Sequence, residues 1–156
     1  MRCCGCPVRL PPGDDALSGS TSSEIPAPVR VAVLDDEESY RRALSRLLRA
    51  HGYDVETFAS GEGLKAGAAA HRFDCVLLDL YIPGMSGFDV LAELRLEPSA
   101  PPVIVITAHD DADHVRRALA LGAFECQHKP IGAPRLIDAI ERARRRLPDA
   151  SRVGAA

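Results

Sequence analysis

No stretch of the sequence is apolar over the roughly 18 residues that a membrane-spanning helix needs. The N-terminus also lacks the apolar core of a secretory signal. Nor is there an excess of basic residues, since the formal net charge is -3. General affinity for nucleic acid or for an anionic membrane favours basic patches and is therefore not expected. These absences predict a soluble, cytoplasmic protein without a nucleic-acid or membrane partner.

Cysteines suited to a disulfide framework are also missing. The count of five is odd, and two of them, Cys75 and Cys126, fall in predicted buried strands. The others, Cys3, Cys4 and Cys6, cluster near the N-terminus. Tetrahedral zinc needs four ligands, and no Cys/His pair follows this cluster. We interpret the cluster as part of a disordered leader rather than as a metal site.

Local composition divides the chain into three parts. Residues 1–28 are rich in Pro, Ser, Thr and Gly and show no hydrophobic period, which predicts a disordered leader. Residues 29–147 are long enough for one domain with one core, and residues 148–156 form a short C-terminal tail. Neither flank is expected to fold alone, which predicts a stand-alone domain. A fragment of a longer chain, or a later start near residue 28, is the alternative.

Strand-like and helix-like segments alternate five times within this domain, as in βαβ units of a parallel sheet. Three strands are almost wholly apolar, which predicts helices on both faces. Right-handed crossovers then give an α/β fold with a doubly wound five-stranded parallel sheet of order 2-1-3-4-5, called flavodoxin-like. The expected strands are 31–34, 54–58, 75–78, 103–106 and 125–128, and the expected helices are 38–51, 61–70, 87–96, 111–121 and 133–146.

Four of these strands end in acidic, hydroxyl or amine side chains. Asp35 and Asp36 follow the first strand, and Asp79 follows the third. Thr107 follows the fourth strand, and Lys129 the fifth. In an open parallel sheet of this order the crevice lies outside the C-terminal ends of strands one and three. The three carboxylates are therefore expected to meet there.

Three close carboxylates repel one another, and a hard divalent cation relieves the repulsion. Mg²⁺ prefers about six oxygen ligands and commonly keeps several waters beside one or two carboxylates. We expect Asp36 and Asp79 to be direct ligands and Asp35 to hold a metal-bound water. The backbone carbonyl of Tyr81, two residues beyond Asp79, is the expected additional ligand.

Once its charge is neutralised in this way, Asp79 can attack phosphorus as a nucleophile and form an acyl phosphate. Thr107 then offers a hydroxyl and Lys129 a positive charge to the phosphoryl oxygens. Ala108 keeps the mouth of the site small. An aspartyl-phosphate hydrolase commonly carries Asp-x-Asp, and the tyrosine at residue 81 argues against that class.

Four motifs resemble those of bacterial two-component response-regulator receiver domains of the single-domain, chemotaxis-regulator kind. They are DDE at 35–37, LLDLYIPGMSG at 77–87, ITA at 106–108 and KP at 129–130. They occur in order, each at a strand end, and the likeness extends over about residues 29–146. It implies that Asp79 takes a phosphoryl group from a phosphohistidine on a sensor histidine kinase or a histidine phosphotransfer protein. It also implies that Thr107 and Lys129 sense the phosphate and that the Lys129–Pro130 bond is cis.

The resemblance further implies that the domain is not an enzyme, although it catalyses its own phosphorylation and slow acyl-phosphate hydrolysis. Phosphorylation would alter binding of a target protein or relay the phosphoryl group onward. The last two helices and the fifth strand would form the surface for that target or for a homodimer.

Cys126 departs from the family pattern, in which a Tyr or Phe usually stands three residues before the lysine. A thiol cannot fill the volume of an aromatic ring that swings inward when the threonine moves. We therefore expect the signal to travel instead through the helix after Thr107 and the strand before Lys129. Tyr81 and His109 flank the expected mouth, either as ordinary loop side chains or as residues that control water access and acyl-phosphate lifetime.

Two other function classes remain open at this stage. Residues 61–66, GEGLKA, follow a strand and open a helix, as in a dinucleotide-binding fingerprint, but they leave the strand-end residues unexplained. A pseudo-receiver, which keeps the fold as a binding module without phosphorylation, is the second. Arginines at 142 and 144–146 are interpreted as a solvated helix end rather than a nucleic-acid patch, and Asp110, Asp111 and Asp113 as helix-capping residues.

Overall fold

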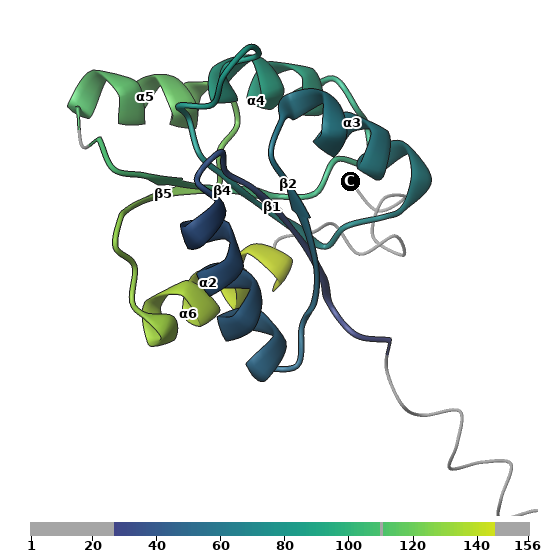
Figure 1. Ribbon diagram of the computed structural model, residues 1–156. Coiled ribbons are helices and arrows are strands. Elements are labelled where there is room, and N and C mark those ends of the chain that lie inside the picture. Colours follow the sequence, from purple (N-terminus) through teal and green to yellow (C-terminus); the bar gives the residue numbers. More distant parts are fainter. Residues whose placement is uncertain (1–26, 110, 146–156) are drawn as a thin grey trace, which may run out of the picture.

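The computed structural model describes residues 27–109 and 111–145, which form alternating strands and helices (Figure 1). The strands are β1 (Arg30–Leu34), β2 (Asp54–Phe58), β3 (Cys75–Leu78), β4 (Val103–Thr107) and β5 (Glu125–His128). The helices are α2 (Glu38–Ala50), α3 (Gly61–Ala70), α4 (Gly87–Arg95), α5 (Ala112–Ala120) and α6 (Ala133–Arg145). Each predicted boundary differs from the observed one by no more than one residue.

Several expectations lie outside the described residues. These concern most of the leader 1–28, the tail 148–156, Cys3, Cys4, Cys6, Asp110 and Arg146. Within the described ranges, no helix is long and apolar enough to cross a membrane.

The strands form one parallel sheet of order β2-β1-β3-β4-β5, which confirms the predicted topology. Leu34 of β1 pairs with Leu78 of β3, and Leu78 pairs with Val105 of β4. Asp35 and Asp79 follow Leu34 and Leu78 directly, at the same edge of the sheet. This register is what brings Asp35 and Asp79 side by side.

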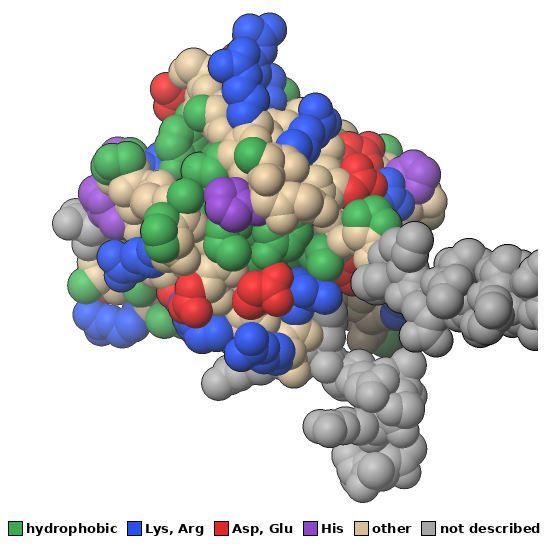
Figure 2. Space-filling model, turned by 90° about the horizontal axis from the view of Figure 1, so that it is seen from below, with side chains coloured by type: hydrophobic (Ala, Val, Ile, Leu, Met, Phe, Trp, Pro, Cys, Tyr) green, Lys and Arg blue, Asp and Glu red, His purple; other side chains and the backbone are tan. Residues whose placement is uncertain are grey.

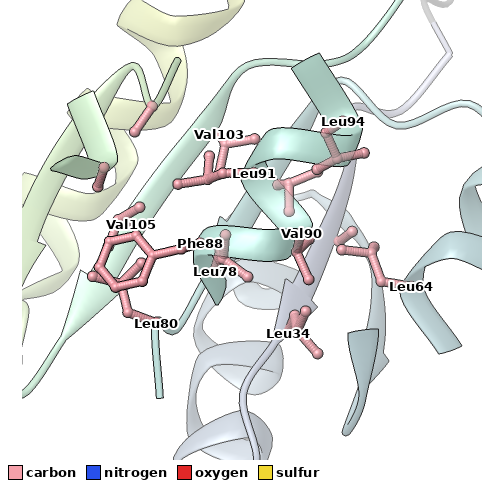
Figure 3. Packing of buried hydrophobic residues seen from close by; sticks show 14 of the residues in the cluster. Leu34, Leu64, Leu78, Leu80, Phe88, Val90, Leu91, Leu94, Val103 and Val105 are labelled. Atoms are coloured by element: carbon pink, nitrogen blue, oxygen red, sulfur yellow. The ribbon is translucent and has the colours of Figure 1, made fainter. Parts of the chain in front are cut away.

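The sheet is covered on both faces, as the apolar strands predicted (Figure 1). In β1, Val31 and Val33 face a core cluster shared with α2 and α6, whereas Ala32 and Leu34 face a second cluster shared with α3 and α4. This alternation is the period of two expected of a strand. Figure 3 shows the second cluster, in which α4 contributes Phe88, Val90, Leu91 and Leu94.

Helix α2 deviates slightly from its predicted apolar face. Leu44 and Leu48 are buried, and Tyr40 and Leu47 are half-buried against the same cluster, but Ala43 is exposed. The buried stripe is therefore narrower than the sequence pattern suggested.

Asp111 caps α5 by accepting from the N–H of Asp113, as predicted.

Candidate phosphoacceptor site

The three predicted acids meet at the carboxyl edge of the sheet. Ligand oxygens of Asp35, Asp36 and Asp79 all lie within 4.8 Å of one another. Asp35 and Asp79 are buried, whereas Asp36 is exposed. The pocket therefore has a desolvated pair of carboxylates with a third carboxylate open to solvent.

Lys129 enters this pocket from the end of β5. Its Nζ lies 2.6 Å from Asp35 Oδ2 and 3.3 Å from Asp79 Oδ2. The exposed fraction is 12% for the Lys129 side chain and only 4% and 8% for its two partners. Charge-assisted hydrogen bonds of this kind are strong when they are shielded from water. The ammonium thus bridges the two buried carboxylates.

Backbone amides hold the other oxygens of both carboxylates. The N–H of Glu37 donates to Asp35 Oδ1 at 2.8 Å, and the N–H of Tyr81 donates to Asp79 Oδ1 at 3.2 Å. Each aspartate therefore has one oxygen fixed by the turn that follows it and the other directed toward Lys129. Both donors lie two residues beyond the acid, as in an Asx turn.

The environment shifts the pKa values of Asp79 and Lys129. Burial raises the pKa of Asp79 above its usual value and outweighs the opposing effects of the Tyr81 amide and Lys129. Burial alone would lower the pKa of Lys129, but the hydrogen bond to Asp35 and the nearby negative charges raise it. Lys129 therefore stays protonated, and it lies beside Asp79, whose ionisation is disfavoured by burial.

Thr107 is the last residue of β4 and lies beside Lys129. It is buried, its Oγ1 accepts from the N–H of His109 at 3.2 Å, and its carbonyl accepts from the N–H of Lys129 at 2.8 Å. Ala108, between Thr107 and His109, is exposed, and its side chain is a single methyl group.

The rings of Tyr81 and His109, which follow Asp79 and Thr107 by two residues each, lie against each other with centroids 4.2 Å apart and planes tilted by 53°. The Tyr81 hydroxyl also lies 2.5 Å from Nδ1 of His114 on α5. His114 could not be identified from sequence, because it lies 33 positions from Tyr81 and resembles any polar residue of an amphipathic helix. These contacts connect the loop after Asp79 to α5.

Gly87, at the start of α4, permits a close approach behind Asp79. A Cβ at this position would lie 2.5 Å from the Asp79 carbonyl oxygen and 2.5 Å from Leu80 Cα. Both atoms belong to the backbone and cannot yield as a flexible side chain would.

The Lys129–Pro130 bond is cis, as the resemblance implied.

Cys126 is half-buried on β5, and its sulfur lies 4.0 Å from the Val115 carbonyl oxygen. Burial, with the charge of Glu125, raises the pKa of its thiol to about 11. The thiol is therefore neutral at physiological pH and contributes little beyond packing.

The donors present fit a hard divalent cation, since the three carboxylates offer the oxygen ligands that Mg²⁺ prefers. The structure does not bring sulfur or imidazole ligands into this acidic cluster within the described ranges. Lys129 balances part of the negative charge of Asp35 and Asp79.

Two arginines of α6, Arg142 and Arg144, are engaged in ion pairs. Arg142 contacts Glu125 at 2.6 Å and Asp138 at 2.8 Å, and Arg144 contacts Glu141 at 2.9 Å. Figure 2 views the molecule from the side of α2 and α6, where basic side chains lie beside acidic ones and hydrophobic patches. Such a mixed surface agrees with a solvated helix end rather than a nucleic-acid patch.

The sheet order and the acidic pocket together are those of a receiver domain. The family model described as response regulator receiver domain matches residues 31–141. The chain therefore belongs to the response regulator receiver domain family of two-component systems. Members of this family are not enzymes in the usual sense, interact with histidine kinases and downstream effectors, and generally bind Mg²⁺ at an acidic pocket.

Curated relatives include the transcriptional regulatory protein KdpE of Mycobacterium tuberculosis, which is 42% identical over 116 residues. That alignment covers 74% of this chain and 51% of KdpE. The sensory transduction protein RegX3 of Mycolicibacterium smegmatis is 39% identical over 125 residues, covering 80% of this chain and 54% of RegX3. The chain thus spans about half the length of these relatives.

Solved structures of similar proteins have the same fold. The chemotaxis protein CheY4 of Vibrio cholerae superposes with a TM-score of 0.71 at 29% identity, covering 75% of this chain and 99% of CheY4. A response regulator receiver domain protein from Clostridium thermocellum gives a TM-score of 0.69 at 35% identity, covering 76% and 95%. The structure does not favour the dinucleotide-binding alternative for residues 61–66, because Met85 and Ser60 occupy the space beside Gly61 and Gly63.

Proposed function

We propose that Asp79 accepts a phosphoryl group from a phosphohistidine on a sensor histidine kinase or a histidine phosphotransfer protein. The observation that supports this most is the Lys129 ammonium, held between two buried carboxylates and 3.3 Å from an Asp79 oxygen. A fixed cation beside a desolvated nucleophile is suited to a group that carries negative charge on several oxygens.

In the proposed step an Asp79 carboxylate oxygen attacks phosphorus opposite the imidazole nitrogen of the donor. The O–P bond forms, the P–N bond breaks, its electron pair stays on nitrogen, and the imidazole takes up a proton. Lys129 stabilises the phosphoryl oxygens as a point charge. The Thr107 hydroxyl, which accepts from the His109 N–H, still has a proton to donate to one of those oxygens.

Mg²⁺ bound to the acidic cluster would neutralise the carboxylates and the phosphoryl oxygens. We assign Asp36 and Asp79 as its carboxylate ligands and the Tyr81 backbone carbonyl as a further donor. Asp35 would hold a water ligand while its Oδ1 stays fixed by the Glu37 amide.

Mass spectrometry after incubation with acetyl phosphate and Mg²⁺ tests this proposal. The wild-type chain should gain one phosphoryl group, and Asp79→Asn or an excess of EDTA should abolish the gain. Asp74→Asn is the matched control. Asp74 precedes the first residue of β3, at the other end of the strand from Asp79, and its side chain accepts from the Arg30 N–H. A wild-type chain that gains no mass would instead be a pseudo-receiver.

We further propose that Tyr81 and His109 limit the access of water to the acyl phosphate and that Ala108 keeps the mouth of the site small. The contact of the two rings, whose planes are tilted by 53°, beside the loop after Asp79 supports this role. Tyr81→Asn and His109→Glu should each change the dephosphorylation rate of the purified phosphoprotein. Unchanged rates in both variants would refute the role.

The readout is proposed to pass through α5 and β5 to a target protein or to a second copy of the chain. Tyr81 supports this route, because its hydroxyl contacts His114 on α5 and its amide contacts Asp79. Residues 29–147 are proposed as the receiver domain. Amide spectra recorded with and without a beryllofluoride phosphoryl mimic should differ over α5 and β5, and matching spectra would defeat the idea.

A further inference from the structure

We propose that Tyr40 is a positioning residue for Lys129, whose ammonium it holds on its ring face beside Asp79. This inference rests on the proposed phosphoryl transfer and adds to it a residue that lies outside the four motifs. Tyr40 is on the first turn of α2, four residues after Asp36.

The ring of Tyr40 completes the surroundings of the ammonium. Lys129 Nζ lies 4.4 Å from the Tyr40 ring centroid, 2.6 Å from Asp35 Oδ2 and 3.3 Å from Asp79 Oδ2. An ammonium carries three protons, and here two carboxylates and an aromatic face surround it. The ring quadrupole attracts the cation, and the attraction is strongest where the cation is shielded from water.

Packing fixes the ring that Lys129 contacts. Tyr40 is half-buried against the α2/α6 core cluster, and its hydroxyl is buried. Within the described part of the chain this hydroxyl makes no hydrogen bond of normal geometry, although the Ile131 backbone lies near enough to oppose the effect of burial on its pKa. Burial still raises that pKa, so the ring remains a neutral aromatic.

The two carboxylates hold the Lys129 ammonium, and the Tyr40 ring adds a third contact to it. Its four-carbon stem has rotamer freedom that costs free energy to restrict. Tyr40 from α2 limits this freedom, so the charge stands ready where phosphoryl oxygens will form. Preorganised charge of this kind accelerates a reaction without reorganisation during the step.

The test compares Tyr40→Phe, which keeps the ring, with Tyr40→Leu, which removes it. Lys65 and Lys129 are the lysines of the chain, so a spectrum of protein labelled with ¹³C-lysine resolves them readily. Lys65, half-exposed in an ion pair with Glu93, serves as the internal reference. The Lys129 ε-methylene protons should be shifted upfield by the ring current in the wild type and in Tyr40→Phe, and not in Tyr40→Leu.

The rate of phosphorylation by acetyl phosphate with saturating Mg²⁺ is the second readout. We expect Tyr40→Leu to slow it about three- to tenfold, which lies between the values of an exposed and a fully shielded cation–π contact, and Tyr40→Phe to stay within about twofold of wild type. Tyr53→Leu is the matched control, because Tyr53 packs in the same core cluster and bonds to Glu141 instead. It should leave both readouts unchanged.

An unshifted Lys129 signal in the wild type, or equal rates in wild type and Tyr40→Leu, would overturn the inference. So would a Tyr53→Leu rate as slow as that of Tyr40→Leu, because the effect would then be a general loss of packing. If the wild type is not phosphorylated at all, the proposed function fails instead. The ring-current shift, measured on unmodified protein, still decides whether the Tyr40–Lys129 contact exists.

Discussion

The pocket around Asp79 and the face formed by β5 and α5 differ in how they are held together. In the pocket, Lys129 bridges Asp35 and Asp79 at 2.6 and 3.3 Å, and backbone amides fix the remaining carboxylate oxygens. On the β5/α5 face, the Cys126 sulfur has a long 4.0 Å contact with the Val115 carbonyl. The first region is held by directed charge and the second mainly by packing.

This difference separates the chemistry from its readout. The pocket brings together Asp35, Asp36, Asp79 and Lys129, whereas residue 126, where the family usually has a Tyr or Phe, is a cysteine with a neutral thiol. Substitutions in the pocket should therefore alter both stability and phosphorylation. Substitutions at Cys126 should alter neither by much.

Lys129→Met should have the largest effect. It leaves Asp35 and Asp79 buried and facing one another, so the free energy of unfolding at neutral pH should fall by about 3 kcal/mol in EDTA. Urea unfolding measures this loss. Lys65→Met, which breaks an exposed ion pair with Glu93, should change stability little, and equal losses in the two variants would erase the contrast between pocket and surface.

Gly87→Ala should come next, with a loss of about 2 kcal/mol and slower phosphorylation, because the added methyl group meets the Asp79 and Leu80 backbone. Thermal unfolding and the acetyl phosphate assay measure the two effects. Gly132→Ala is the control, since its Cβ would have only Pro134 Cδ within 4 Å, at 3.9 Å. A Gly87→Ala protein as stable as that control would show that the loop behind Asp79 adapts freely.

Asp79→Asn should stabilise the fold at neutral pH by about 1 kcal/mol, the scale of an ordinary single substitution. Folding raises the pKa of Asp79 above 3.8, so the folded state binds this proton more tightly than the unfolded chain does. Stability therefore falls as pH rises from 3.8 through the folded pKa, and it is the ionised form that carries the penalty.

Urea unfolding of both proteins across this range checks the sign. The difference between variant and wild type should vanish at the acidic end and be largest at neutral pH. A variant less stable than wild type at neutral pH would mean that the contact with Lys129 outweighs burial.

Cys126→Ala should have the smallest effect, at most about 1 kcal/mol, because it removes one half-buried sulfur atom. Phosphorylation by acetyl phosphate should stay within about twofold of wild type. A large loss of phosphorylation would show that β5 and the pocket are coupled more tightly than their contacts indicate.

The fold was predictable because the strands carry the strongest signals in the chain. Uninterrupted apolar runs such as Cys75–Leu78 require cover on both faces, and glycines such as Gly52 and Gly122, both with positive φ, end the preceding helices. The position of the site followed from topology, since parallel strands bring their carboxyl ends to one edge.

Contacts between side chains of different elements were not predictable. Tyr40 looked like one more residue on an apolar helix face, and its contact with Lys129 depends on how α2 lies across the sheet. The Tyr81–His114 contact depends likewise on the path of the loop before α5. Periodicity gives the face on which a residue lies but not which partner it meets.

The measurement that tests the central claim most directly locates the phosphoryl group. Borohydride reduction converts an aspartyl phosphate to homoserine, which peptide mass spectrometry assigns to one position. After phosphorylation with acetyl phosphate and Mg²⁺, we predict homoserine at residue 79 and at no other aspartate of the pocket. Homoserine at Asp35 or Asp36, or none in a chain that has gained a phosphoryl group, would contradict the assignment of Asp79 as the phosphoacceptor.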